Sequence, residues 1–150
     1  MFHLTPQDID FSIRLMVSAF LGGMVGLERE LHGKDAGFRT YALVSLGSAL
    51  MMIVSVQVYE IYRGTANVDP SRIAAQVVSG IGFLGAGAIM RFPQQGIKGL
   101  TTAAGIWAVS GIGLACGLGL YYPAALTTLF TLVILIVFSQ VDRLFGGKDF

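Results

Sequence analysis

Only a few side chains in this sequence could do chemistry, and most of them lie in or beside long apolar stretches. They combine a charge or a hydrogen-bonding group with such a position: Arg14, Glu28, Arg39, Asp69, Arg72, Gln76, Ser79, Lys98 and Thr101. A polar group inside a membrane-spanning segment is costly, so it indicates a function or a contact between helices. We predict that these residues form a functional polar network.

The same residues do not have the pattern of a catalytic centre. There is no Ser-His-Asp set with its members on one side, no pair of carboxylates in a cleft and no phosphate-binding loop, so we do not expect an enzyme. His3 and His32 are far apart, and Cys116 has no Cys or His at ligand spacing, so we predict neither a metal site nor a cofactor. Residues 80–85 fit the dinucleotide-binding pattern G-x-G-x-x-G, but no strand precedes them. We interpret these glycines as packing residues.

The composition is that of an integral membrane protein. The chain has 150 residues, of which 54% are hydrophobic and 13% charged, and its mean hydropathy is +0.70. Soluble domains carry about 25% charged residues. A net charge of +1, without a basic run, gives no sign of nucleic-acid binding. We predict one all-α membrane domain that occupies residues 1–150.

Five apolar segments approach the roughly 20 residues that a membrane-spanning helix needs. We expect the spans at about 9–27, 40–58, 70–90, 100–120 and 123–141. No Lys or Arg precedes the first span, so it does not resemble a signal peptide and should be retained. With the N-terminus outside, two basic residues of the connections lie outside, Arg63 and Arg72, and seven lie inside: Arg29, Lys34, Arg39, Arg91, Lys98, Arg143 and Lys148. The positive-inside rule therefore predicts an external N-terminus and a cytoplasmic C-terminus.

The third span is predicted to lie in the middle of the bundle. Asp69 caps its N-terminus and Pro70 occupies the first turn. At 100° per residue, Arg72, Gln76 and Ser79 fall within one third of the circumference and form a polar stripe. Six glycines are expected to let helices approach closely: Gly22 and Gly26 in the first span, and Gly80, Gly82, Gly85 and Gly87 on two sides of the third.

Two arginines in or beside the first two spans suggest ion pairs. Asp10 stands four residues before Arg14, so their side chains are close enough to pair along the helix. Two interpretations of Arg14 stay open, because it either snorkels to the lipid headgroups or faces the bundle interior. Glu28 and Arg39 lie where the first two spans meet the cytoplasmic surface. We predict that they form an ion pair that closes this end of the bundle.

Three stretches together resemble the membrane domain of the MgtC/SapB family. They are residues 26–30 followed by 37–40 (Gly-Leu-Glu-Arg-Glu and Gly-Phe-Arg-Thr), residues 69–87, and residues 98–104 (Lys-Gly-Leu-Thr-Thr-Ala-Ala). The resemblance covers residues 9–140 and implies a multi-pass protein of the bacterial inner membrane, linked to growth in low magnesium and, in some members, to virulence. It points to Glu28, Arg39, Asp69, Arg72, Gln76, Ser79, Lys98 and Thr101. Many relatives carry a soluble C-terminal domain, which we do not expect here because the chain ends at Phe150.

Two functions stay open. The first is a non-catalytic regulator that binds other membrane proteins through glycine-lined faces; in some members of the family such a partner is the proton-driven ATP synthase. The second is a small channel or carrier for magnesium, potassium or protons, in which Glu28, Asp69 and Gln76 line the path. Five spans make a thin bundle, so we expect a homo-oligomer, with a dimer as the first choice. Basic residues outnumber acidic ones along the stripe and would repel a cation, which favours the regulator.

Overall fold

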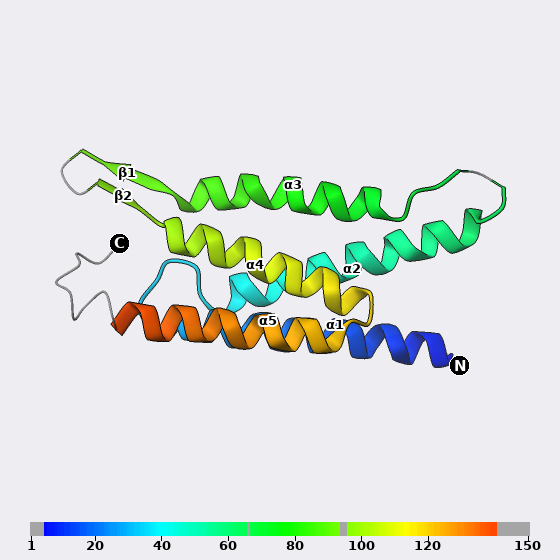
Figure 1. Cartoon of the computed structure of the whole chain (residues 1–150), viewed down its shortest axis with the longest axis horizontal. Helices are drawn as coiled ribbons and strands as arrows, with labels where there is room; N and C mark the ends of the chain where they lie inside the picture. Colours follow the sequence, from blue (N-terminus) through cyan, green and yellow to red (C-terminus); the bar gives the residue numbers. More distant parts are fainter. Residues whose placement is uncertain (1–4, 66, 94–95, 141–150) are drawn as a thin grey trace.

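The computed structural model describes residues 5–65, 67–93 and 96–140. Within these ranges the fold is a bundle of long α-helices, as predicted (Figure 1). The helices are α1 (Pro6–Leu31), α2 (Phe38–Tyr62), α3 (Ser71–Ala88), α4 (Leu100–Gly117) and α5 (Tyr121–Val133), which continues as a π-helix, Ile134–Phe138. The predicted end of the last span at residue 141, His3, and the basic residues Arg143 and Lys148 lie outside the described residues.

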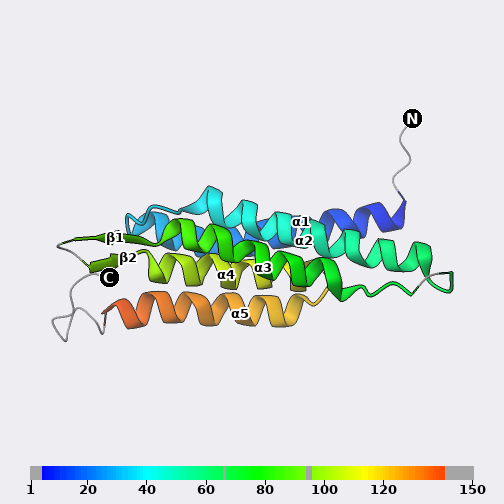
Figure 2. The ribbon, with the colours of Figure 1, turned by 90° about the horizontal axis from the view of Figure 1, so that it is seen from above.

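Successive helices run in opposite directions, so α1 starts at the end of the bundle opposite to the one where α5 stops (Figures 1 and 2). One end holds the loop between α1 and α2 and a short antiparallel hairpin of β1 (Met90–Phe92) and β2 (Gly96–Lys98), in which Met90 pairs with Lys98. We call it the hairpin end, and we call the opposite end, with the α2–α3 and α4–α5 connections, the loop end. The positive-inside rule predicts that the hairpin end is cytoplasmic.

Four of the described helical segments are long and apolar enough to cross a membrane: α1, α2, α4, and α5 with its π-helical extension. The chain is therefore a multi-pass membrane protein. The helix α3 has the same length as α4, 18 residues, but Arg72 and Gln76 lower its apolarity, and it is not among the four. It nevertheless packs along α4, so the two helices lie side by side in the bundle (Figure 1).

The centre of the bundle is formed by α1, α2 and α4, which make its most extensive helix contacts. The helix α3 packs on α4 and α2, and α5 packs on α4 and α1. The prediction that the third span lies in the middle is therefore wrong. Of the residues of α3, only Ile81 and Gly85 are buried, because α3 uses one side to contact the bundle and leaves the other exposed.

Glycines allow the central helices to approach each other closely. A Cβ atom built on Gly26 of α1 would lie 2.8 Å from Phe38 Cα of α2, and one on Gly22 would lie 2.8 Å from the Tyr41 carbonyl oxygen. In α3, Gly85 lies against Ala103 of α4, at 3.7 Å by the same measure. The other three glycines of α3 do not pack as expected, since a Cβ atom on any of them would meet no described residue within 4 Å: Gly80, Gly82 and Gly87.

Candidate functional site

A charged cluster is buried where α1 reaches the hairpin end. Glu28 is 6% exposed and Arg29 3%. Arg29 Nη2 donates to Glu28 Oε1 at 2.6 Å, and Arg29 Nε donates to Glu28 Oε2. His32 Nδ1 lies 3.0 Å from the same Oε1 atom and 2.8 Å from the Glu28 carbonyl oxygen. A carboxylate and a guanidinium in this two-bond arrangement satisfy each other, so Glu28 and Arg29 together carry no net charge.

The predicted pair between Glu28 and Arg39 is wrong. Arg39 is exposed and has no charged partner among the described residues. It stands two residues before Tyr41 on α2, and Tyr41 is fully buried. Residues two apart on a helix point about 200° away from each other, so Arg39 faces outward where Tyr41 faces in. Glu28 takes its neighbour Arg29 instead.

Glu30 connects the end of α1 to the start of α2. Its Oε2 atom accepts a hydrogen bond from the Phe38 backbone N–H at 2.8 Å. Gly37 precedes Phe38 at the N-cap and offers no side-chain cap, and a Cβ atom there would lie 2.7 Å from the same oxygen. The carboxylate thus satisfies one unpaired N–H of α2 and lies at the positive end of the helix dipole. The sequence reasoning missed the roles of Arg29 and Glu30, although both belong to the charged run at residues 28–30.

Tyr41 joins α2 to α4 beside this cluster. Its hydroxyl donates to the Thr102 carbonyl oxygen at 3.1 Å, and Gly105 makes room for the ring, because a Cβ atom there would lie 2.6 Å from the hydroxyl oxygen. The hydrogen bond satisfies the polar end of a buried aromatic side chain. Tyr41 was also missed, because nothing in the sequence distinguishes a tyrosine at a membrane interface from one in the core.

Arg14 faces the bundle rather than the headgroups. Its side chain is 23% exposed, and Nη2 pairs with Asp10 Oδ2 at 2.7 Å, as the spacing predicts. Nη1 donates to the carbonyl oxygen of Gly117, the last residue of α4, at 2.8 Å. A cation at this position satisfies a carbonyl that has no partner within its own helix and complements the helix dipole. Arg14 therefore connects α1 to the C-terminus of α4 at the loop end.

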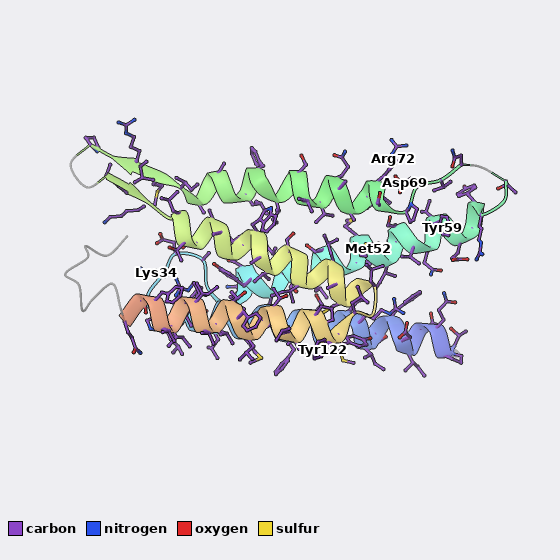
Figure 3. All side chains as sticks on the ribbon, in the orientation of Figure 1. Lys34, Met52, Tyr59, Asp69, Arg72 and Tyr122 are labelled. Atoms are coloured by element: carbon purple, nitrogen blue, oxygen red, sulfur yellow. The ribbon has the colours of Figure 1, made fainter. Side chains whose placement is uncertain are left out.

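The polar stripe of α3 points away from the bundle. Arg72 extends outward from the ribbon in Figure 3, and Gln76 and Ser79 are exposed too, without a hydrogen-bond partner among the described residues. The prediction that Asp69 is the N-cap residue is wrong, because α3 begins one residue later and its N-cap is Pro70, without a side-chain cap. The Asp69 Oδ1 atom instead accepts hydrogen bonds from the Ser71 backbone N–H at 2.8 Å and hydroxyl at 2.7 Å. These bonds lower the pKa of the Asp69 carboxyl below its ordinary value of 3.8.

The predicted residues do not meet at one site. Arg14 and Glu28 lie 14 residues apart on α1, which is about 21 Å along a helix. Thr101 is exposed on the first turn of α4, and Lys98 of β2 places its Nζ atom 5.6 Å from the centre of the Phe92 ring. Most of the predicted residues therefore fall into three separate places, which are the buried cluster at the hairpin end, the Arg14 contact at the loop end and the outward stripe of α3. Arg39, Lys98 and Thr101 belong to none of them.

Two cavities lie between α3 and its neighbours, one toward each end of the bundle. The cavity at the hairpin end has a volume of about 290 Å³, and its polar lining residues are Asp35, Thr40 and Thr102. The cavity at the loop end has a volume of about 620 Å³ and is mostly apolar, with Glu60 and Ser71 in its lining; its α2 wall includes Met52 and Tyr59 (Figure 3). No three His, Cys, Asp or Glu side chains of the described residues come close enough together to hold a metal ion.

These features define a multi-pass membrane helix bundle with paired charges at the ends of its first helix and an exposed polar stripe on its third. A family model described as the MgtC family matches residues 15–144. The chain belongs to the MgtC family, as its motifs predicted. No solved structure matches it significantly.

Three relatives illustrate the similarity. The chain is 47% identical over 143 residues to the protein named "Putative magnesium transporter YhiD" of Escherichia coli (strain K12), with 94% of this chain and 66% of that protein covered. It is 38% identical over 143 residues to Protein SapB of Bacillus subtilis, with 93% and 61% covered. It is 43% identical over 122 residues to Protein MgtC of Salmonella typhimurium (strain LT2), with 81% and 49% covered. The chain thus spans about half to two thirds of the length of these relatives.

Proposed function

We propose that this protein is a non-catalytic regulator of magnesium homeostasis in the bacterial inner membrane, and that it acts by binding other membrane proteins. The link to magnesium comes from the name of the relative YhiD. The regulator part rests on one observation, which is that the polar stripe of α3 faces outward while the centre of the bundle is filled.

Close contacts between α1, α2 and α4 argue against a hydrated path between these three helices. Ser18 of α1 and Ser45 of α2 form a hydrogen bond of 2.9 Å with each other, and both are fully buried. A Cβ atom on Gly117 of α4 would lie 2.7 Å from Met52 Cβ of α2. Ion pathways need a wide, polar or hydrated lining, and these contacts are close and self-satisfied.

The outward stripe of α3 suits contact with a protein better than contact with lipid. Lipid tails offer no partner for the Gln76 amide or the Ser79 hydroxyl, whereas the side chains and backbone of a neighbouring helix do. A regulator that works through contacts within the membrane needs such an exposed polar face. A channel formed by a single chain would need the stripe inside.

Ion flux into liposomes tests the proposal. Purified protein is reconstituted into vesicles loaded with indicators for magnesium, potassium or protons, and flux is compared with that of empty vesicles. An ionophore added at the end verifies that the vesicles are sealed, and circular dichroism verifies that the protein is helical. We expect no flux above that of empty vesicles. Flux that disappears in the Gln76→Leu variant would overturn the proposal.

Growth in low magnesium tests the proposed role in magnesium homeostasis. In cells that lack the protein, we expect the wild type and a Phe130→Leu variant on the exposed side of α5 to restore growth equally. The Gln76→Leu variant should fail to restore growth although it reaches the membrane in the same amount. Full restoration by Gln76→Leu would contradict a role for the α3 stripe.

The second candidate is an oligomeric cation channel or carrier, and the two cavities favour it. Each is lined by one residue with a carboxylate, Asp35 at the hairpin end and Glu60 at the loop end. Between them, Ile81 and Gly85 pack α3 onto the bundle and separate the two cavities. If this candidate is right, the liposomes conduct, and Asp35→Asn and Glu60→Gln each reduce the flux, whereas Asp8→Asn at the exposed start of α1 does not.

A further inference from the structure

We propose that α3 pairs with α3 of a second copy of this chain, in a parallel dimer with two-fold symmetry. The inference rests on the proposed function in one respect, that the outward face of α3 contacts protein. The face is formed by residues that alternate at spacings of four and three and that are all exposed: Arg72, Gln76, Ser79, Phe83 and Ala86. Phe83 is 83% exposed, more than the other large apolar side chains of the described residues.

The 4-3-4-3 spacing is that of the contact line between two helices wound around each other. Such a line places each residue into a hole formed by four residues of the facing helix. For Phe83 the hole would consist of Ser79, Gly82, Phe83 and Ala86 of the second copy. The residue opposite this line, Ile81, is the one that packs inside the bundle, so the two sides of α3 are divided between the bundle and the proposed partner.

The positions that flank the contact line are small. Between residues 75 and 87 they are Ala75, Gly80, Gly82 and Gly87. The three glycines would meet no described residue within 4 Å if they carried a Cβ atom. Buried glycines of α1 and α4, in contrast, lie against a neighbouring helix. Small flanking residues let membrane helices approach until their backbones are nearly in contact, and a second α3 would give these three glycines the neighbour that the others have.

The polar residues of the face complement themselves under two-fold symmetry. All copies cross the membrane in the same direction, so a symmetric pair of α3 helices is parallel, and each residue of the contact line lies beside its own counterpart. The Gln76 amide both donates and accepts, and so does the Ser79 hydroxyl, so each pairs with its copy. A polar residue at such a position fixes the register of paired helices.

The charges at the start of α3 complement each other as well. Two copies of Arg72 would repel, but Asp69 lies three residues earlier, close to the start of the same helix. Asp69 already feels the charge of Arg72 in its own chain. Because both hydrogen bonds that it accepts from Ser71 use Oδ1, Oδ2 can also accept from Arg72 of the second copy. The two helices would then be joined at the loop end by two ion pairs, each between Asp69 of one copy and Arg72 of the other. This complementarity favours a second copy over a lipid surface as the occupant.

Disulfide cross-linking along α3 tests the proposal. Cys116 is first replaced by alanine, and the variant is retained only if its helical content is unchanged. Single cysteines are then introduced by Ser79→Cys, Phe83→Cys and Ala86→Cys on the contact line, and by Val78→Cys and Leu84→Cys at exposed positions of α3 beside it. The purified proteins are oxidised in lipid vesicles at a low ratio of protein to lipid. We expect dimers from the first three and at least fivefold less from the other two.

Removal of the amide gives an independent measure. In the Phe83→Cys background, Gln76→Leu should reduce the dimer fraction about threefold at limiting concentration. A threefold change is the effect of one interhelical hydrogen bond of average strength. Ala74→Leu, on the bundle side of α3, should alter folding instead. Equal cross-linking at all exposed positions, or an unchanged dimer fraction in Gln76→Leu, would overturn the dimer. If the protein is monomeric and conducts no ions, the dimer is refuted but the regulator is not. If it is dimeric and conducts ions, the regulator is refuted but the dimer is not.

Discussion

Gly113 offers a sharp test of the close packing between α2 and α4. A Cβ atom at this position would lie 2.8 Å from Ser48 Cβ and nearer still to the Ser45 carbonyl oxygen, whereas ordinary Cβ contacts begin at 3.4 Å. The carbonyl belongs to the backbone of α2 and cannot rotate away. In Gly113→Ala the two helices must therefore move apart by roughly 1 Å, and overpacking of this kind costs about 1–3 kcal/mol.

Gly111 is the matched control, two residues earlier on the same helix. A Cβ atom there would meet nothing within 4 Å. Both substitutions gain the same helix propensity, about 1 kcal/mol for alanine over glycine, so the difference between the variants isolates the packing effect. We expect Gly113→Ala to be about 1–3 kcal/mol less stable than Gly111→Ala.

The assay is reversible unfolding of the purified protein from detergent micelles with increasing sodium dodecyl sulfate, followed by circular dichroism. Both variants are compared with the wild type at the same detergent ratio. A difference within about 0.5 kcal/mol, an amount typical of neutral surface substitutions, would refute this reasoning. It would mean that α2 and α4 are not in close contact at Gly113 and that the bundle is not closed there.

Three further perturbations are expected to have separate effects. Glu28→Ala leaves Arg29 buried without its carboxylate and should lower the free energy of unfolding by about 3–5 kcal/mol, and most of the loss should be recovered when Arg29→Met is added; the same unfolding assay measures both. Arg14→Met removes the donor to the last carbonyl of α4 and should cost about 1–2 kcal/mol, with faster hydrogen exchange confined to the C-terminal turn of α4. The lowered pKa of Asp69 means that its bonds to Ser71 stabilise the start of α3 fully above about pH 4 and are lost as the pH falls through the folded-state pKa. A nuclear magnetic resonance titration of the Ser71 amide should follow that change in the wild type and show none in Asp69→Asn.

The number and order of the helices could be predicted, because long apolar runs are the dominant signal in a membrane protein. Their ends could not. The second helix was expected at 40–58 and extends over Phe38–Tyr62. The first begins at Pro6 because Thr5 and Asp8 form a capping box, in which each side chain bonds to the backbone of the other residue. Apolar length reflects how much of a helix meets lipid, whereas the polar groups of its first turn decide where it begins.

The partner of Glu28 could not be predicted for a different reason. Neighbouring residues on a helix point about 100° apart and do not normally face each other. Glu28 and Arg29 pair because both side chains are buried together at the end of α1, where water cannot satisfy them. A sequence contains the spacing along a helix but not the burial that overrides it. Arg39 was predicted as the partner because it lies, like Glu28, where a span meets the cytoplasmic surface.

The position of α3 at the edge of the bundle could not be predicted either, because the sequence does not show which of its residues are buried. This position explains the polar stripe. The sequence shows glycines in both α3 and α4, and it does not show what they face. In α4, Gly105, Gly113 and Gly117 lie against side chains of α2, so α4 is central. In α3 only Gly85 lies against another helix in this chain. The bundle contact of α3 is made through its apolar side, which leaves the polar side as its outer surface. The polar side of α3 therefore lies at the rim of the bundle, and the spacing of its exposed residues is the observation on which the proposed parallel pairing with a second α3 rests.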